Sequence, residues 1–92
     1  MTNSRHDGNG ERKFFGAVTK SFKVLVGESK TEVRDQIAKR HIAKHNFVLF
    51  SCRSDGDGKV REEIIGRARF KLTKAHYVVL EKACVNFLAK EV

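Results

Sequence analysis

The sequence has no proline, no internal repeat and only two cysteines. No apolar run approaches the length that spans a bilayer, and the N-terminal residues contain no apolar signal-peptide segment. We therefore expect a cytoplasmic protein that does not associate with membranes. Because Cys52 and Cys84 each lie among apolar neighbours, we predict two reduced, buried thiols rather than a disulfide.

The motifs of catalysis and metal binding are also missing. His41 and His45 have the spacing of two metal ligands on a helix, but the stretch HIAKH lacks the glutamate of the zinc-protease motif. A calcium loop starting at Asp55 would place Lys59 at a ligand position and Val60 where glycine is needed. No glycine-rich phosphate loop precedes a helix, and spacing ties no base to a nucleophile. We predict a protein that is not an enzyme and binds no cofactor.

The 92 residues carry a formal net charge of +8, which is typical of proteins with an anionic partner. The length suits one domain. Residues 1–12 are polar after the initial Met and are predicted to be a flexible arm, and residues 13–92 are predicted to form the domain. The excess of cations lies on segments with strand and helix patterns, so a basic tail does not account for it.

The N-terminal half predicts a strand followed by a helix. Residues 13–26 alternate between apolar and polar side chains, which fits one long strand or two short strands broken near Lys20; the constant alternation favours one. Ser29 and Glu32 have the spacing of a capping box, so we expect the helix to begin there. The helix is predicted to continue to residue 45 with Asn46 as its C-cap, because a broad apolar arc runs along it: Val33, Ile37, Ala38, His41 and Ile42.

The C-terminal half predicts a hairpin and a second helix. Residues 47–54 and 59–72 flank the sequence DGDG, whose Asp and Gly residues favour a turn. After Thr73, one helical stripe is apolar and should pack on the sheet: Tyr77, Leu80, Cys84, Phe87 and Leu88. The predicted fold is α+β, with two layers in the order β-α-β-β-α, a three-stranded antiparallel sheet, and both helices on one face.

The most informative pattern lies in residues 59–72. Even positions are mostly apolar, and odd positions carry five cations, so one face of this strand should be strongly basic. Guanidinium groups bind phosphates through paired charge-assisted hydrogen bonds, and aromatic residues such as Phe47 can stack on unpaired bases. The candidate anion-binding residues are Arg53, Arg61, Arg67, Arg69 and Lys71, assisted by Lys39, Arg40 and Lys44.

Several interpretations of this face stay open. It can bind nucleic acid, RNA or DNA, or it can be an ordinary solvated sheet surface, and a bulge at residues 64–66 would reverse the alternation. In its small size, basic compact α+β pattern and lack of motifs, the chain resembles phage-encoded inhibitors of the anti-CRISPR kind. That resemblance implies a host RNA-guided complex as partner, a blocked nucleic-acid channel, and the host cytoplasm as location.

Two other families bear on the same segments. The final hairpin and helix are similar to those of single-strand-binding transcriptional coactivators, but the predicted helix of residues 31–45 interrupts that family's run of strands. A ribosome-associated factor is a further alternative. For the oligomeric state, a monomer is favoured. Val78 and Val85 lie on the flank of the apolar stripe of the last helix and are expected at the periphery of the core, with a dimer contact as the alternative.

Overall fold

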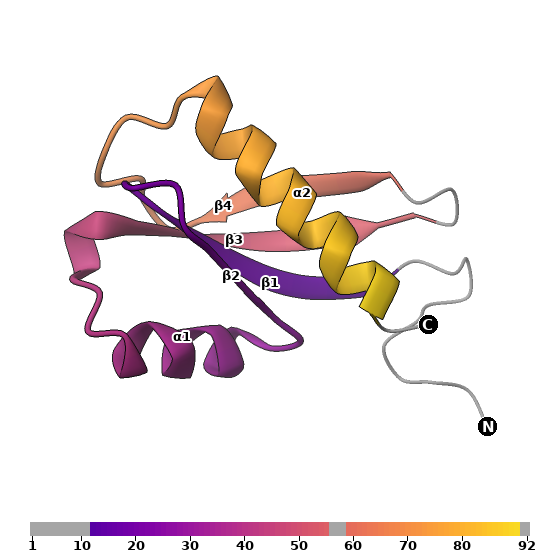
Figure 1. Ribbon diagram of the computed structural model, residues 1–92, viewed down its shortest axis with the longest axis horizontal. Coiled ribbons are helices and arrows are strands. Elements are labelled where there is room, and N and C mark those ends of the chain that lie inside the picture. The colour runs from indigo at the N-terminus through magenta and orange to yellow at the C-terminus, as the bar shows by residue number, and fades with distance from the viewer. Residues whose placement is uncertain (1–11, 56–58, 91–92) are drawn as a thin grey trace.

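The computed structural model describes residues 12–55 and 59–90 (Figure 1). Their secondary structure is α+β, as predicted, with an antiparallel sheet of four strands and two α-helices. The elements follow one another as β1 (Arg12–Thr19), β2 (Val24–Gly27), α1 (Lys30–Lys39), a 3₁₀ turn η1 (Lys44–Asn46), β3 (Phe47–Ser54), β4 (Val60–Ile65) and α2 (Lys74–Lys90). The strands lie side by side in the order β2-β1-β3-β4.

The first strand-like segment forms two strands, so the prediction of one long strand in a three-stranded sheet is wrong. The chain reverses at Phe22, whose φ is +72°, and the Thr19 N–H donates to the Lys23 carbonyl oxygen across the turn. Val18 then lies opposite Val24 in the antiparallel pair. Directly opposed residues point to the same face, so the apolar alternation passes through the turn unchanged. The alternation therefore could not distinguish one strand from two.

The two helices lie on opposite faces of the sheet, which corrects the prediction that both lie on one face. Leu80 and Cys84 of α2 pack with Phe14, Val18 and other residues of the same parity. Val33 and Ile37 of α1 pack with Ala17, Leu25 and Leu49, which point the other way. Figure 1 shows α2 crossing the strands and α1 lying apart from it, below them. We call these the α2 face and the α1 face.

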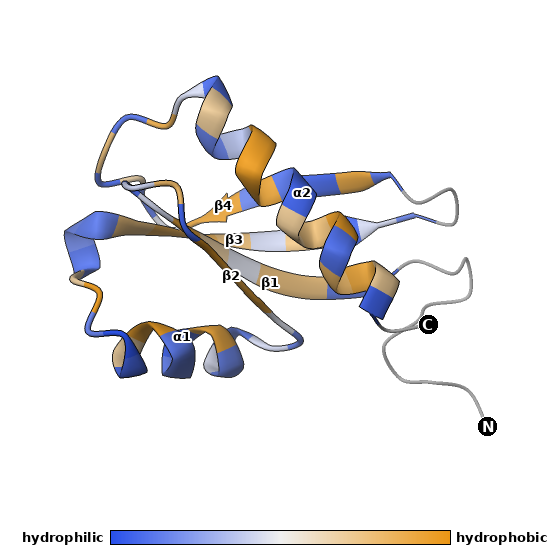
Figure 2. Cartoon of the chain, in the orientation of Figure 1, coloured by the Kyte–Doolittle hydropathy of each residue, from blue (hydrophilic) through white to orange (hydrophobic). Residues whose placement is uncertain are grey.

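Helix α1 begins as predicted but ends early. The Ser29 hydroxyl accepts from the Glu32 N–H at 3.1 Å, and the Glu32 carboxylate accepts from the Glu28 N–H at 3.0 Å. At the other end, His41 has φ +54°, and the N–H groups of His41 and Ile42 donate to carbonyl oxygens of the last turn. This is a Schellman motif, and it ends the helix at Lys39 with Arg40 as the C-cap, rather than at residue 45 with Asn46 as the C-cap. Figure 2 shows the hydrophobic side of α1 turned toward the sheet.

Helix α2 closes the larger part of the core. Leu80 and Cys84 are fully buried, and Phe87 and Leu88 pack against the same cluster, as predicted. Tyr77 is 38% exposed and meets the Phe50 ring edge-on, with centroids 5.9 Å apart. The helix starts after Thr73, whose N–H donates to His76 Nδ1 at 3.0 Å.

Both cysteines are free and buried, which confirms that prediction. Their sulfur atoms lie 3.8 Å apart across the β3–α2 contact, and the two thiols share a hydrogen bond. That hydrogen bond, together with burial, raises the pKa of the Cys52 thiol far above its ordinary value. We conclude that these thiols act as small apolar core residues in the folded state.

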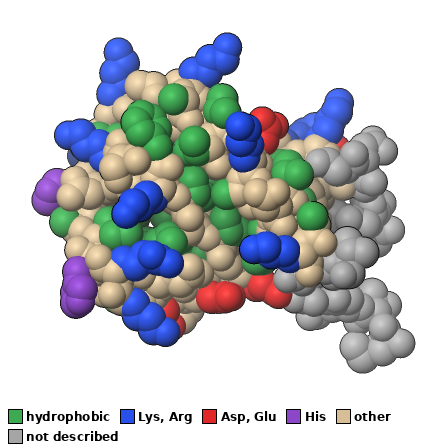
Figure 3. Space-filling view, in the orientation of Figure 1, with side chains coloured by type: hydrophobic (Ala, Val, Ile, Leu, Met, Phe, Trp, Pro, Cys, Tyr) green, Lys and Arg blue, Asp and Glu red, His purple; other side chains and the backbone are tan. Residues whose placement is uncertain are grey.

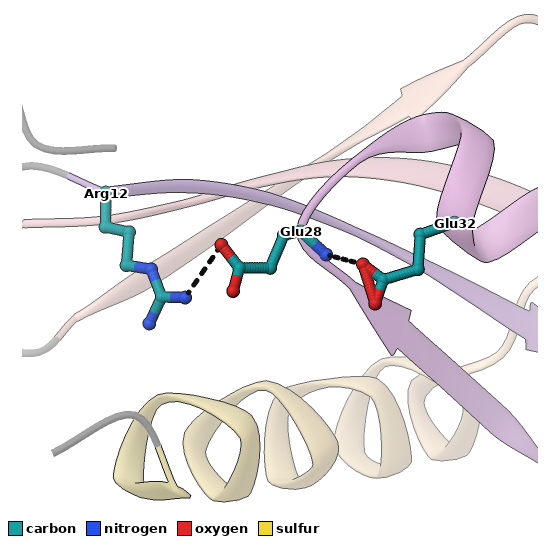
Figure 4. A network of polar contacts seen from close by, with 3 residues as sticks. All are labelled: Arg12, Glu28 and Glu32. Carbon is teal, nitrogen blue, oxygen red and sulfur yellow. Dashed lines mark hydrogen bonds and ion pairs between the residues drawn. The ribbon is translucent and has the colours of Figure 1, made fainter. Parts of the chain in front are cut away.

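Arg12 anchors the start of β1. It is only 5% exposed, its guanidinium lies 5.1 Å from the centre of the Phe87 ring, and Arg12 Nη2 lies 3.5 Å from Glu28 Oε1 (Figure 4). Glu28 is in turn linked to Glu32 through its backbone N–H. Arg12 therefore belongs to the sheet and not to the predicted arm. The rest of that arm, residues 1–11, lies outside the described residues.

Candidate nucleic-acid interface

The α1 face is only partly covered by its helix. Helix α1 packs mainly on β1 and β2. Beyond it, β3 and β4 pair antiparallel with Leu49 opposite Ile65 and Arg53 opposite Arg61. Arg61 and Ile65 of β4 point to this face, while Val60 and Ile64 pack on the α2 face. The predicted alternation therefore holds for β4, and it leaves exposed cations on the uncovered half of the α1 face.

Three cations stand in a row across neighbouring strands at the hairpin end of this face. Lys13 lies opposite Arg53, and Arg53 lies opposite Arg61. All three are exposed. We call them the cation row. Like charges directly opposite one another destabilise a sheet. Arg53 and Arg61 also line a hollow of about 260 Å³ with Ser51, Glu62 and Glu63, and Glu63 shares the parity of Arg61, so an acidic residue lies on the same face as this part of the row.

A second cluster, at the opposite end of β3, has no carboxylate among its lining residues. It is a hollow of about 150 Å³ with four cations around three apolar side chains, and we call it the cation groove: Arg34, Lys44, Arg67, Arg69, Phe47, Leu49 and Ile65. The cations come from three segments, namely α1, η1 and the chain after β4. Leu49 is buried and Phe47 and Ile65 are half-buried, so they form the floor while the cations form an exposed rim.

Arg67 and Arg69 reach the groove by a route that the sequence pattern did not predict. Strand β4 ends at Ile65, because Gly66 has φ +81° and turns the chain out of the ladder. The predicted hairpin is confirmed for β3 and β4, where Asp55 and Lys59 hydrogen-bond to each other, but residues 66–72 are not strand. Residues 56–58 of the predicted turn lie outside the described part. Arg67 and Arg69 are thus brought together, but as loop residues.

The remaining predicted residues lie elsewhere. Arg40 is the C-cap of α1 and lines a third hollow, beside the β1–β2 turn. Lys39 and Lys71 are exposed, and neither is among the residues that line these three hollows. Sequence reasoning missed Arg34 and Lys13. The parity of Lys13 along β1 could have placed it in the cation row. Arg34 could not be assigned to the site without knowing where α1 lies over the sheet.

Within residues 12–55 and 59–90, no group of three or more His, Cys, Asp or Glu side chains is placed to hold a metal ion. His41 and His45 are both exposed and do not lie on one helix, so they are not one helical turn apart as their spacing suggested. No helix in the same ranges is long and apolar enough to cross a membrane. Figure 3 shows Lys and Arg side chains spread over much of the surface on the side of α2 as well.

Comparisons with known proteins add no relative. No protein-family model matches the chain, and neither a curated protein nor a solved structure matches it. The class that the structure defines is therefore a small α+β protein with a four-stranded antiparallel sheet between two helices.

Proposed function

We propose that this protein binds single-stranded nucleic acid on the uncovered half of the α1 face and catalyses no reaction. The observation that carries the proposal is the cation groove, in which four cations from three segments surround a floor that contains Phe47. Guanidinium and ammonium groups contact backbone phosphates, and a half-buried aromatic ring offers a surface on which an unpaired base can stack.

The cation row extends this site along the sheet. Arg53 and Phe47 are six residues apart along β3, which corresponds to about 20 Å at 3.3 Å per residue. A single strand crossing this distance meets positive charge at both ends.

The test is a salt titration of binding to a single-stranded oligonucleotide of about 12 nucleotides, a length within the range of single-strand sites. The variant is Arg67→Gln with Arg69→Gln. We expect weaker binding and a slope of log affinity against log salt that falls by about 0.7 for each phosphate that the variant no longer neutralises. Both side chains are exposed, so the stability should change by no more than about 0.5 kcal/mol, which circular dichroism during thermal unfolding checks.

The matched control is Lys82→Gln with Lys90→Gln, which removes the same charge from exposed positions on α2. Affinity should fall much less in this control than in the groove variant. Equal losses in the two double variants would show that net charge alone drives binding, and the proposed site would be wrong.

A second candidate is an inhibitor of the anti-CRISPR kind, which would hold a host nucleoprotein complex rather than free nucleic acid. The observation in its favour is the exposed apolar surface of α2, where Tyr77, Val78 and Val85 are 38%, 41% and 49% exposed. Such side chains suit a protein contact. In this case neither the wild type nor the groove variant would bind a bare oligonucleotide, while the groove variant would lose inhibition of the complex.

A further inference from the structure

A third cation-lined hollow lies between the β1–β2 turn and the end of α1. Its volume is about 560 Å³, against 260 and 150 Å³ for the hollows on the sheet face, and it falls within the size range of small-molecule sites. We call it the turn hollow, and nine residues line it: Thr19, Lys20, Ser21, Lys23, Arg40, His41, Ile42, Ala43 and Asn46.

The lining of the turn hollow has one sign of charge. Lys20, Lys23 and Arg40 supply three cations, and no Asp or Glu is among the lining residues. The hydroxyls of Thr19 and Ser21 add polar groups that can share hydrogen bonds with an anion. The three cations and two hydroxyls surround one hollow of small-molecule size, so they can converge on one anionic group. They suit a phosphate monoester, which carries about −1.5 to −2 at neutral pH.

The wall that carries the two lysines is held in place from several sides. Thr19 Oγ1 accepts from the Lys23 N–H at 2.9 Å, and the Lys20 N–H donates to the Asn46 carbonyl oxygen at 2.9 Å. Because His76 Nδ1 accepts from the Thr73 N–H, the ring proton lies on Nε2, which is 3.3 Å from the Lys20 carbonyl oxygen and donates to it. The lysines therefore project from a turn that needs little reorganisation when an anion binds.

Phe22 at the tip of the turn strengthens this anchoring. Its ring stacks on the His76 ring with centroids 4.3 Å apart, and its positive φ is unfavourable for a bulky side chain. The stack and the surrounding hydrogen bonds hold the residue in that conformation. Such strained residues cluster where a ligand is clamped.

The opposite wall is the C-terminal end of α1, where free carbonyl groups would repel an anion. Here the Schellman motif covers them. The N–H of Arg40 donates to the Gln36 carbonyl oxygen, that of His41 to Ala38, and that of Ile42 to Ile37. The helix end thus presents the Arg40 and His41 side chains to the hollow while three of its last carbonyls are engaged.

From this arrangement we infer that the turn hollow binds the phosphoryl group of a phosphate monoester, with Lys20, Lys23 and Arg40 as its counter-charges. The group can come from a free nucleotide or from the 5′ end of a nucleic-acid strand, since the chemistry recognised is the same. This site is separate from the cation groove and does not depend on the function proposed for it.

The experiment compares binding of adenosine 5′-monophosphate and adenosine to the full chain, by calorimetry or amide chemical shifts. The variant Lys20→Gln with Lys23→Gln should lower affinity for the monophosphate by about tenfold or more, because charge-assisted hydrogen bonds are the strong ones. The pairs Lys82→Gln with Lys90→Gln and Arg67→Gln with Arg69→Gln should leave it within about twofold, since neither pair lines the turn hollow. All six positions are exposed, so the variants should fold.

A second arm compares 5′-phosphorylated and 5′-hydroxyl forms of one oligonucleotide. If the phosphorylated form binds more tightly and Lys20→Gln with Lys23→Gln abolishes the difference, the phosphoryl group comes from a strand end. If both forms bind equally and the monophosphate still binds, it comes from a free nucleotide. The inference is overturned if the monophosphate binds no better than adenosine, or if Lys82→Gln with Lys90→Gln weakens it equally. Loss of oligonucleotide binding in the groove variant alone bears only on the proposed function.

Discussion

On one face of the sheet the 17-residue helix α2 buries Leu80 and Cys84 against Phe14 and Phe50; on the other, the 10-residue helix α1 covers only part of a surface whose remainder carries cations. The two faces are built by the same strands with the same alternation. They differ because α2 supplies a long apolar stripe, whereas α1 buries only Val33 and Ile37. The larger cluster of buried side chains therefore lies on the α2 face, and we expect that face to contribute more of the stability while the α1 face carries like charges.

The largest expected effect is on the α2 face. Leu80 is fully buried, and its side chain packs closely on Gly16 of β1. Leu80→Ala should lower the free energy of unfolding by about 3 kcal/mol, because it removes buried apolar surface and leaves a residual cavity. Urea denaturation measures this loss of unfolding free energy, and Val78→Ala on the exposed side of α2 is the control. A cost below about 1 kcal/mol for Leu80→Ala would show that α2 is not the main source of stability.

On the α1 face, the N-terminal cap of the helix gives a smaller expected effect. Ser29→Ala removes the acceptor of the Glu32 N–H and should lower the free energy of unfolding by about 1 kcal/mol. Thr31→Ala, at an exposed position in the same first turn, should have a smaller effect. The same denaturation measurement compares them. If the two changes were equally small, the capping box would not hold α1 on the sheet.

The smallest expected effect concerns Glu62, a half-buried carboxylate on the α2 face. Burial and the nearby negative charge of Glu81 raise the pKa of Glu62 above its ordinary value of 4.5. The folded state therefore favours the protonated form, and its contribution to stability is full below that ordinary value and is lost as pH rises through the raised pKa. Glu62→Gln should be more stable than wild type at pH 7, and the difference should shrink on acidification. An unchanged difference between pH 7 and pH 4 would contradict this.

Local signals predicted the elements, but they did not predict how the elements join. The capping box at Ser29, the hairpin pairing of β3 with β4 and the buried thiols all depend on residues close in sequence or on burial patterns. The division of residues 12–27 at Phe22 was hidden because a turn that keeps opposed residues on one face also keeps the parity. The Schellman end of α1 was hidden because His41, rather than Gly or Asn, adopts the positive φ.

The sequence predicted which cations belong to the candidate site better than it predicted where they lie in the fold. Arg53 and Arg61 follow from strand parity and lie opposite one another. Arg67 and Arg69 were expected on the same strand, but Gly66 turns them toward α1, where they meet Lys44 and Arg34. The placement of the two helices on opposite faces of the sheet determines which cations line the cation groove. That placement depends on tertiary packing, because each helix has an apolar stripe that either face could accept.

The central claim is that nucleic acid binds the α1 face, and amide chemical-shift mapping tests it most directly. A single-stranded oligonucleotide titrated into labelled protein should shift the amides of Lys44, Phe47, Arg67 and Arg69 in a saturable, salt-sensitive manner. The amides of Val78, Lys82 and Val85 on the outer side of α2 should stay in place. Saturable shifts confined to α2, with the groove residues unchanged, would contradict the account.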